Sequence, residues 1–194
     1  MNNKGILFFF AGFIAMLVFG WFLFPSLMYQ KLEQPFHFSH VTHTEMTGMS
    51  CNDCHYVKSD GQFSGIPTNE NCSMCHMGIL GETEDERIFV EEYMMQDREV
   101  PWFVYSRQPE NVYFPHVQHI DFGEISCERC HGEHGTSESL RPFQRNRLSG
   151  YSRDIWGPSI SRINNPAGIG MKMNDCIRCH EQSELTIGCI GCHK

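Results

Sequence analysis

The sequence predicts a mostly helical protein with one N-terminal membrane anchor and a soluble part whose interior is not made of side chains alone. Three observations predict this. Much of the apolar content of the 194 residues lies in the first thirty, so the remainder is too poor in apolar residues to bury an ordinary core. All ten cysteines fall in five copies of C-x-x-C-H, and two stretches share a histidine-rich template. The net charge of −8 argues against nucleic acid as a partner.

The anchor is expected within residues 1–30. No charged residue lies between Gly5 and Gln30, and Ile6–Phe24 is almost entirely apolar. Nineteen helical residues rise roughly 28 Å, which is enough to cross a hydrocarbon core of about 30 Å. Pro25 is expected to end the helix. The alternative is a cleaved secretory signal, but no small-residue cleavage site precedes Gln30. We expect an uncleaved, single-pass anchor in the inner (cytoplasmic) membrane.

The charges around the anchor predict its orientation. Lys4 and the N-terminal amine are the positive charges before the apolar run. Positive charge weakly favours the cytoplasmic side, so the N-terminus is expected in the cytoplasm and the rest of the chain in the periplasm.

The five C-x-x-C-H motifs indicate covalent haem c. Two thiols three positions apart reach the two vinyl groups of one haem, and the adjacent histidine binds the iron from the same face. A disulfide framework, a zinc site or an iron–sulfur cluster would also use cysteines, but none of these needs a histidine after every second cysteine. The predicted attachment cysteines are Cys51, Cys54, Cys72, Cys75, Cys127, Cys130, Cys176, Cys179, Cys189 and Cys192. The predicted proximal iron ligands are His55, His76, His131, His180 and His193.

Five haems would supply the missing core. With roughly 33 exported residues for each haem, the chain cannot build thick layers of secondary structure. The predicted fold class is therefore a multihaem cytochrome c with short α-helices, long loops, almost no β-structure and haems packed against one another. Redox centres packed this closely favour electron transfer.

An internal repeat predicts the distal ligands. Phe38-Ser-His40-Val-Thr-His43 and Phe114-Pro-His116-Val-Gln-His119 share the pattern F-x-H-x-x-H, and seven residues separate each from the next C-x-x-C-H motif. Histidines three apart share one helix face, so each can reach a different iron. We expect His40, His43, His116 and His119 to be distal ligands.

The fifth iron has two candidate distal ligands. His134 follows the third motif, and Met173 precedes the fourth. We assign His37 a surface or hydrogen-bonding role. If every iron has two protein ligands, no haem offers an open position to a substrate, which favours an electron-transfer protein over a multihaem enzyme.

The chain divides into an anchor (1–30), a dihaem module (31–80), an acidic connector (81–110) and a trihaem module (111–194). The connector holds nine acidic residues against three arginines. Thr83 and Glu86 form a capping-box pattern, and Ile88, Phe89 and Met95 are expected to face inward on a short helix. The connector is either a solvated acidic helix or a docking face for a basic redox partner.

Within the trihaem module, a basic loop spans 141–172. It carries six basic residues against one acidic residue. A loop this long is usually functional in a compact protein. Its arginines would neutralise haem propionates, bind anionic lipid headgroups or contact a partner subunit.

The template followed by C-x-x-C-H resembles the class III cytochromes c. Longer stretches resemble the membrane-anchored multihaem subunits of the menaquinone reductase (Qrc) complex of sulfate reducers and of alternative complex III. The stretches that carry this likeness are Gly20-Trp21 with Phe24-Pro25, 34–43, Gly65-Ile66-Pro67, 100–116 and Met173. The first of these and 108–112 look more like the Qrc subunit. The Qrc subunits are associated with six haems, whereas five motifs stand here; a sixth haem would be held without two thioethers and has no visible signature in the sequence.

The resemblance implies a hetero-oligomeric membrane complex with three further kinds of subunit. These are a molybdopterin-oxidoreductase-like subunit, an iron–sulfur subunit and a polytopic quinone-binding subunit. It also implies electron transfer from a soluble periplasmic cytochrome c to a membrane module that reduces menaquinone, as in sulfate respiration. The alternatives are reverse flow from quinol, as in alternative complex III, a stand-alone multihaem quinol dehydrogenase and, less favoured, a multihaem enzyme.

Overall fold

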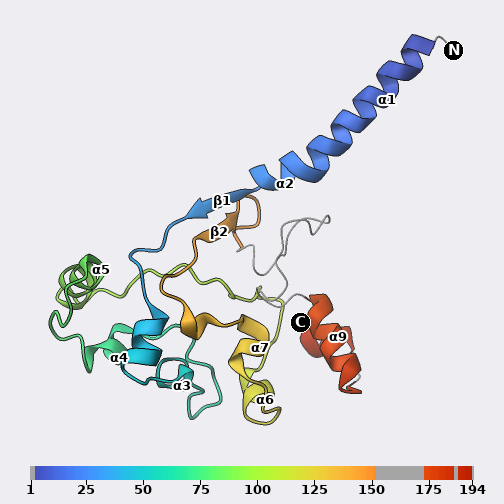
Figure 1. Ribbon diagram of the computed structural model, residues 1–194. Coiled ribbons are helices and arrows are strands. Elements are labelled where there is room, and N and C mark those ends of the chain that lie inside the picture. Colours follow the sequence, from blue (N-terminus) through green and yellow to red (C-terminus); the bar gives the residue numbers. More distant parts are fainter. Residues whose placement is uncertain (1–2, 152–172, 186–187, 194) are drawn as a thin grey trace.

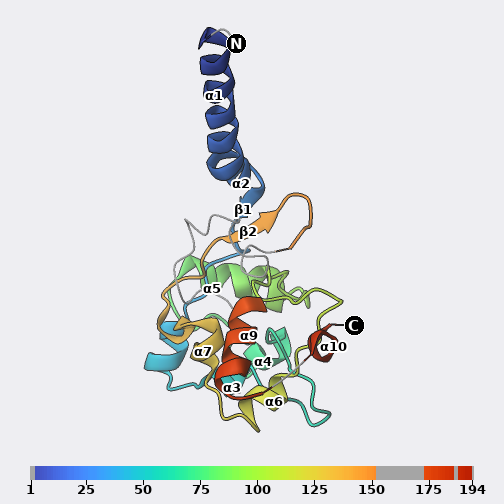
Figure 2. The same cartoon turned by 90° about the vertical axis from the view of Figure 1, so that its right-hand side faces the viewer.

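The structure, a computed structural model, describes residues 3–151, 173–185 and 188–193. One long helix projects away from a body of short helices and loops (Figure 1). In the view turned by 90°, the small helices gather at the end of the body far from the N-terminus (Figure 2). The predicted basic loop 141–172 lies outside the described residues beyond Tyr151.

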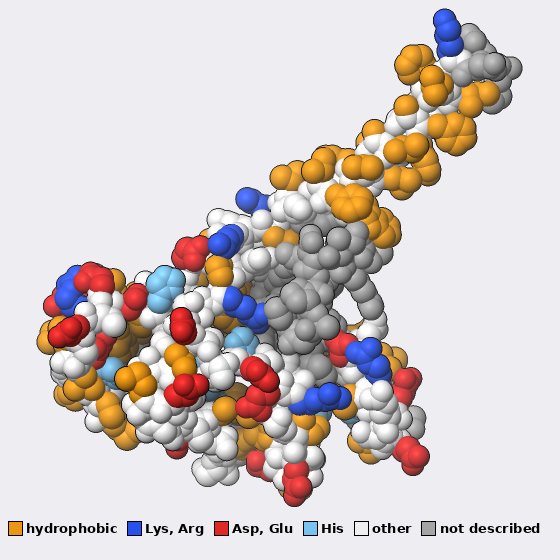
Figure 3. All heavy atoms as spheres, in the orientation of Figure 1, with side chains coloured by type: hydrophobic (Ala, Val, Ile, Leu, Met, Phe, Trp, Pro, Cys, Tyr) orange, Lys and Arg blue, Asp and Glu red, His pale blue; other side chains and the backbone are white. Residues whose placement is uncertain are grey.

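The projecting helix contains the predicted anchor. It consists of α1 (Asn3–Val18), a π-helical turn η1 (Phe19–Leu23) and α2 (Phe24–Leu27). Lys4–Leu23 is long and apolar enough to cross a membrane, and none of it is buried against the rest of the chain. Apolar side chains cover the helix along its length (Figure 3).

The expectation that Pro25 ends this helix is wrong. The chain keeps helical backbone angles through the π-helical turn η1 into α2, and the N–H of Phe24 still bonds to the carbonyl of Phe19. Pro25 lacks the N–H that would continue this pattern, and the wider turn η1 directly before it accommodates the interruption.

A two-stranded antiparallel ribbon joins the base of the anchor to the body. Strand β1 (Tyr29–Leu32) pairs with β2 (Phe143–Asn146), with Tyr29 opposite Asn146 and Leu32 opposite Phe143. This ribbon is the one sheet in the described part of the chain, which agrees with the predicted scarcity of β-structure.

Short helices carry the five haem motifs. They are α3 (Cys51–Cys54), α4 (Asn69–Ser73), α7 (Cys127–His131), α9 (Met173–Gln182) and α10 (Cys189–Cys192). Capping boxes begin two of them: Ser50 with Asp53 before the first motif, and Thr68 with Asn71 before the second. Each pair satisfies backbone N–H groups that a first helical turn leaves without partners. Local sequence therefore favours the turn that brings the two cysteines of a motif together.

Helical turns also carry the histidine templates and the connector. The first template leads into the π-helical turn η2 (Thr42–Met46), and the second forms α6 (His116–Ile120). A 3-10 turn, η4 (His134–Thr136), follows the third motif. The connector forms α5 (Glu84–Ile88) and continues as the π-helical turn η3 (Phe89–Met94).

The side-chain core is small. In the described part of the chain, only Phe36, Phe89, Val90, Tyr93 and Phe143 are buried apolar residues. The first four form one cluster, against which Trp102 packs. A cluster of this size is far from an ordinary core, which agrees with the predicted haem-packed interior.

The connector contributes most of this cluster, though not through all of the predicted residues. Phe89 is buried as expected, but Met95 is 66% exposed, so its inward placement is wrong. The wider turn of η3 changes the helical register and turns Val90 and Tyr93 inward instead.

The two predicted modules contact each other directly. The ring of Phe63 stacks on that of His116 at a centroid distance of 4.0 Å. Residues of the trihaem module in turn contact the first template. Thr44 Oγ1 donates a hydrogen bond to the carbonyl of Gly135 at 2.7 Å, and the N–H of Val41 donates to the carbonyl of Ser137. Each module therefore completes the surroundings of histidines in the other.

Candidate haem sites

The two histidine templates have the same local geometry. Phe38 stacks on His43 at 4.6 Å and meets His40 edge-on at 5.0 Å. Phe114 stacks on His119 at 4.4 Å and meets His116 edge-on at 4.9 Å. The shared phenylalanine therefore orients both histidines of its template.

Hydrogen bonds hold the rings of three site histidines in one tautomer. His43 Nδ1 lies 2.8 Å from the carbonyl oxygen of Ser39, and His119 Nδ1 lies 3.0 Å from that of Pro115. His55 Nδ1 lies 2.6 Å from the carbonyl oxygen of Gly65. A carbonyl oxygen only accepts, so Nδ1 carries the proton and Nε2 keeps its lone pair for a metal.

His40 reaches the same tautomer through a hydroxyl group. Ser137 Oγ donates to the carbonyl of His134 at 2.7 Å, so its proton is already used. The contact of 3.1 Å between His40 Nδ1 and Ser137 Oγ then requires the histidine to donate. This places η4 of the second module beside the first template.

The rings of the distal candidates lie opposite those of motif histidines. His43 and His76 have ring centroids 6.2 Å apart, and His119 and His180 have centroids 6.1 Å apart. The rings of His116 and His131 are parallel, with centroids 6.5 Å apart.

These separations fit a haem iron between two imidazoles. Two imidazole nitrogens bound about 2 Å from one metal ion put the ring centres roughly 6 Å apart. Three motif histidines therefore each have a template histidine at the spacing that a shared haem iron requires.

The surroundings of His40 are more crowded. Its ring lies 6.4 Å from that of His134. Burial, followed by the neighbouring rings of His134, His55 and His43, lowers the pKa of His40 to about 4. Burial is also the main cause that lowers the pKa values of His116 and His131. Lower pKa values keep these imidazoles neutral, and the neutral ring is the form that binds iron.

Comparison with known proteins agrees with this geometry. The cytochrome c3 family matches residues 42–142, which is more than half of the chain and includes three of the five motifs. This chain belongs to the cytochrome c3 family. Haem c is therefore its cofactor. Over 201 aligned residues, the chain is 36% identical to the multihaem cytochrome c subunit of menaquinone reductase from Nitratidesulfovibrio vulgaris (strain Hildenborough), covering 96% of this chain and 89% of the relative.

In this cytochrome c3 chain, the fifth motif lies beside the second template. Val112 forms a β-bridge with His193, and the N–H of Tyr113 donates to the carbonyl of Cys192. Of the two candidates for the fifth distal ligand, Met173 is the first residue of α9 and is 62% exposed. His134 instead lies next to His40.

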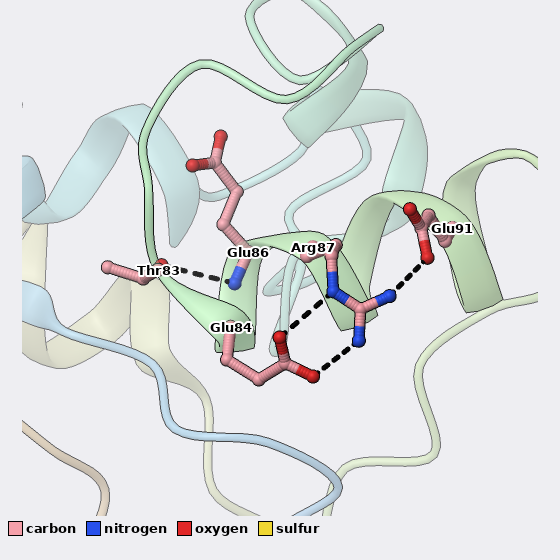
Figure 4. A network of polar contacts seen from close by, with 5 residues as sticks. All are labelled: Thr83, Glu84, Glu86, Arg87 and Glu91. Carbon is pink, nitrogen blue, oxygen red and sulfur yellow. Dashed lines mark hydrogen bonds and ion pairs between the residues drawn. The ribbon is translucent and has the colours of Figure 1, made fainter.

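The acidic residues of the connector have contacts within the chain. Arg87 forms ion pairs with both Glu84 and Glu91 along one side of the helix (Figure 4). Asp85 accepts a hydrogen bond from the N–H of His37, and Glu99 accepts one from that of Asn69. Of these partners only Arg87 carries a charge, so the connector keeps the excess of negative charge that its composition predicts.

Glu86 is the site residue that the sequence pattern misplaced. The hydroxyl of Thr83 accepts from the N–H of Glu86, as the capping box predicts. The carboxylate does not return to Thr83, however, and instead contacts His76. In Figure 4 it points away from the pair formed by Glu84 and Arg87. Sequence spacing could not find this contact, because the helix-capping pattern already accounted for a glutamate here.

Proposed function

We propose that this chain is the membrane-anchored electron-transfer subunit of a menaquinone reductase complex. The observation that carries the proposal is the pairing of motif and template histidines at 6.1–6.5 Å across the body of the protein. The relative of similar length, which is named as a menaquinone reductase subunit, supports the identity of the complex.

The chain is proposed to hold five haems c, each attached at one C-x-x-C-H motif. Three axial pairs follow from the ring distances: His43 with His76, His116 with His131, and His119 with His180.

The fourth pair follows from the equivalence of the templates. His116 pairs with the motif histidine fifteen residues later, and His55 lies fifteen residues after His40. His55 is also among the groups that lower the pKa of His40. We therefore assign His40 to the iron of the first motif. His193 keeps Met173 or His134 as its candidate distal partner.

Haem c, when bound, supplies one-electron redox chemistry. The histidines of the chain then have two tasks. Four of the proposed irons would each be held by two histidines, and the fifth by His193 with Met173 or His134, which would leave a small substrate no place to bind. Contacts at Nδ1, such as that of His55 with Gly65, set the neutral tautomer that this requires. The contact between the modules through Phe63 and His116 keeps the sites of both modules close together.

Location and partners follow from the proposed complex. The anchor would cross the inner membrane once, with the N-terminus in the cytoplasm and the haem-binding body in the periplasm. The expected partners are a molybdopterin-oxidoreductase-like subunit, an iron–sulfur subunit and a polytopic quinone-binding subunit. Electrons would enter from a soluble periplasmic cytochrome c and leave toward menaquinone.

Purification of the native complex tests the proposal. The intact mass of this subunit should equal the full chain plus five haems, and the other subunits should co-purify with it. A soluble reduced cytochrome c should reduce a menaquinone analogue through the complex. A lone homo-oligomer, a chain truncated near residue 30, or an iron that binds carbon monoxide stoichiometrically would contradict the proposal.

The same preparation tests for a sixth haem. His40 is assigned to the first motif, so a further iron near these rings would need His134, whose ring centroid lies 6.4 Å from that of His40, together with another ligand. We expect the total haem extracted per chain to equal the five that are covalently attached. A sixth, extractable haem that is lost in His134→Ala would contradict this assignment.

A further inference from the structure

A single carboxylate contacts a proposed proximal ligand of the first module. Glu86 Oε1 accepts from Nδ1 of His76 at 3.0 Å and from the N–H of Leu80 at 2.9 Å, and Oε2 accepts from the N–H of Gly81 at 2.6 Å. The side chains of His76 and Glu86 are only 22% and 13% exposed. The contact is therefore largely shielded from water. Away from water the charge of an ion acts more strongly on its neighbour.

The backbone around Glu86 holds this carboxylate in place. Thr83 caps the first turn of α5 and fixes the position of Glu86 on it. The loop that follows the second motif then turns the N–H groups of Leu80 and Gly81 toward both oxygens. Burial works to raise the pKa of Glu86, but these N–H groups and His76 outweigh it and hold the pKa below its ordinary value.

His76 differs in this respect from the other site histidines whose Nδ1 partner is known. His43, His55 and His119 contact neutral carbonyl oxygens, and His40 contacts a hydroxyl. A carboxylate withdraws the Nδ1 proton more strongly than a neutral oxygen does, and so makes Nε2 a stronger donor to a metal. A stronger donor stabilises ferric iron relative to ferrous iron and lowers the reduction potential.

We propose that Glu86 is a positioning residue that sets the haem of the second motif, held by Cys72, Cys75 and His76, at a lower reduction potential than its histidine pair alone would give. This inference rests on the proposed function, because it takes His76 as an iron ligand. At this haem an arriving electron is held less strongly and passes on more readily to its neighbours. Glu86 thus gives one haem a lower reduction potential than those of otherwise similar bis-histidine sites.

The test compares two isosteric substitutions on the same helix in the complete haem-loaded complex. Glu86→Gln removes the charge at His76 and keeps the shape and one acceptor oxygen. Glu84→Gln removes the same charge two residues away, where its partner is Arg87. Haems per chain are measured by intact mass, midpoint potentials by a spectroscopic redox titration, and axial ligands by electron paramagnetic resonance of the ferric protein.

We expect five haems in both variants. In Glu86→Gln, one midpoint potential should shift upward while the other four stay in place, and the signal of one ferric low-spin haem should change. Glu84→Gln should move none. Glu86→Asp retains the charge but not the reach, and should give an upward shift smaller than that of Glu86→Gln.

Three outcomes would overturn the inference. The first is that Glu86→Gln keeps all its haems and every midpoint potential stays unchanged. The second is that Glu84→Gln shifts a midpoint potential as much as Glu86→Gln does. The third is that Glu86→Gln loses a haem while Glu86→Asp shows no shift in any midpoint potential. The variant His76→Ala separates this failure from that of the proposed function. If His76→Ala has a high-spin or missing haem while Glu86→Gln shows no change in potential, only the role of Glu86 is refuted. If His76→Ala keeps every haem and its low-spin spectrum, the ligand assignment itself is refuted.

Discussion

The two histidine templates share their local contacts but differ in the residues that pack against them from distant parts of the chain. In both, the phenylalanine stacks on the second histidine, and the ring of that histidine donates to the carbonyl oxygen four residues earlier. The partners differ. His43 lies opposite His76, which a carboxylate contacts, while His119 lies opposite His180 on the C-terminal helix α9.

The first histidines of the templates differ more. His116 has a parallel motif histidine opposite it and Phe63 stacked on its ring. His40 instead has His134 and Ser137 of the other module as neighbours. A six-residue pattern therefore determines the orientation of its own rings, and long-range packing decides what each ring meets.

The largest expected effect comes from removing the second histidine of either template. His43→Ala and His119→Ala should each convert one low-spin haem to a high-spin haem, because the iron loses one of two strong axial ligands. The visible spectrum and the ferric electron paramagnetic resonance signal report this conversion. Equal losses in the two variants would support the equivalence of the templates, and a loss in only one would break it.

The first histidines provide a sharper test. His40→Ala should also produce one high-spin haem, because the template assigns His40 to the motif histidine His55. His134→Ala should leave every haem low-spin if Met173, rather than His134, serves the iron of His193. The same spectra measure both variants. A high-spin haem in His134→Ala, with none in Met173→Leu, would assign the fifth iron to His134 instead.

Met173 lies outside both templates, and its substitution is expected to have a smaller effect, a shift in one midpoint potential. Thioether sulfur is a weaker donor to ferric iron than imidazole, so a haem with a methionine ligand has a higher potential than its bis-histidine neighbours. Met173→His should therefore lower one midpoint potential and leave the other four in place. If Met173→Leu retains every low-spin haem in the redox titration and the spectra, the methionine is not a ligand.

The smallest effect concerns the stacked phenylalanines. Phe38→Leu and Phe114→Leu each remove one ring stack on a histidine, and such pairs contribute about 0.5–1.5 kcal/mol beyond their buried area. Phe38 also meets Trp102 edge-on at 6.4 Å, so thermal unfolding of the haem-loaded protein should show a modest loss for both variants and the larger one for Phe38→Leu. A larger loss for Phe114→Leu would contradict this order.

Much of the fold was predictable because it depends on local sequence. The haem motifs, with capping residues such as Ser50 and Thr68 before them, form short helices, and the family match confirms the cytochrome class. Errors arose where a π-helical turn changed the register. Pro25 lies within a helix that continues through η1 into α2, and Met95 faces outward after η3.

The candidate sites were predictable in composition but not in pairing. The templates identify which histidines are available, since the pattern is local and repeated. The opposition of His119 and His180 depends on how distant segments pack, and no spacing rule contains that information. Glu86 shows the same limit, because one local pattern explained the residue and hid its contact with His76.

The ribbon between β1 and β2 has a consequence for the distance that electrons must travel. Tyr29 enters the sheet two residues after α2 ends, and its partner strand belongs to the body that carries the haem motifs. Phe103 stacks on Phe143 of that strand and joins the ribbon to the interior. A flexible linker would let the body drift tens of ångströms from the bilayer. With the helix in the bilayer as proposed, the paired ribbon would instead hold the body at a short and fixed distance from the membrane surface, and the path from the membrane to the nearest proposed haem would be fixed with it.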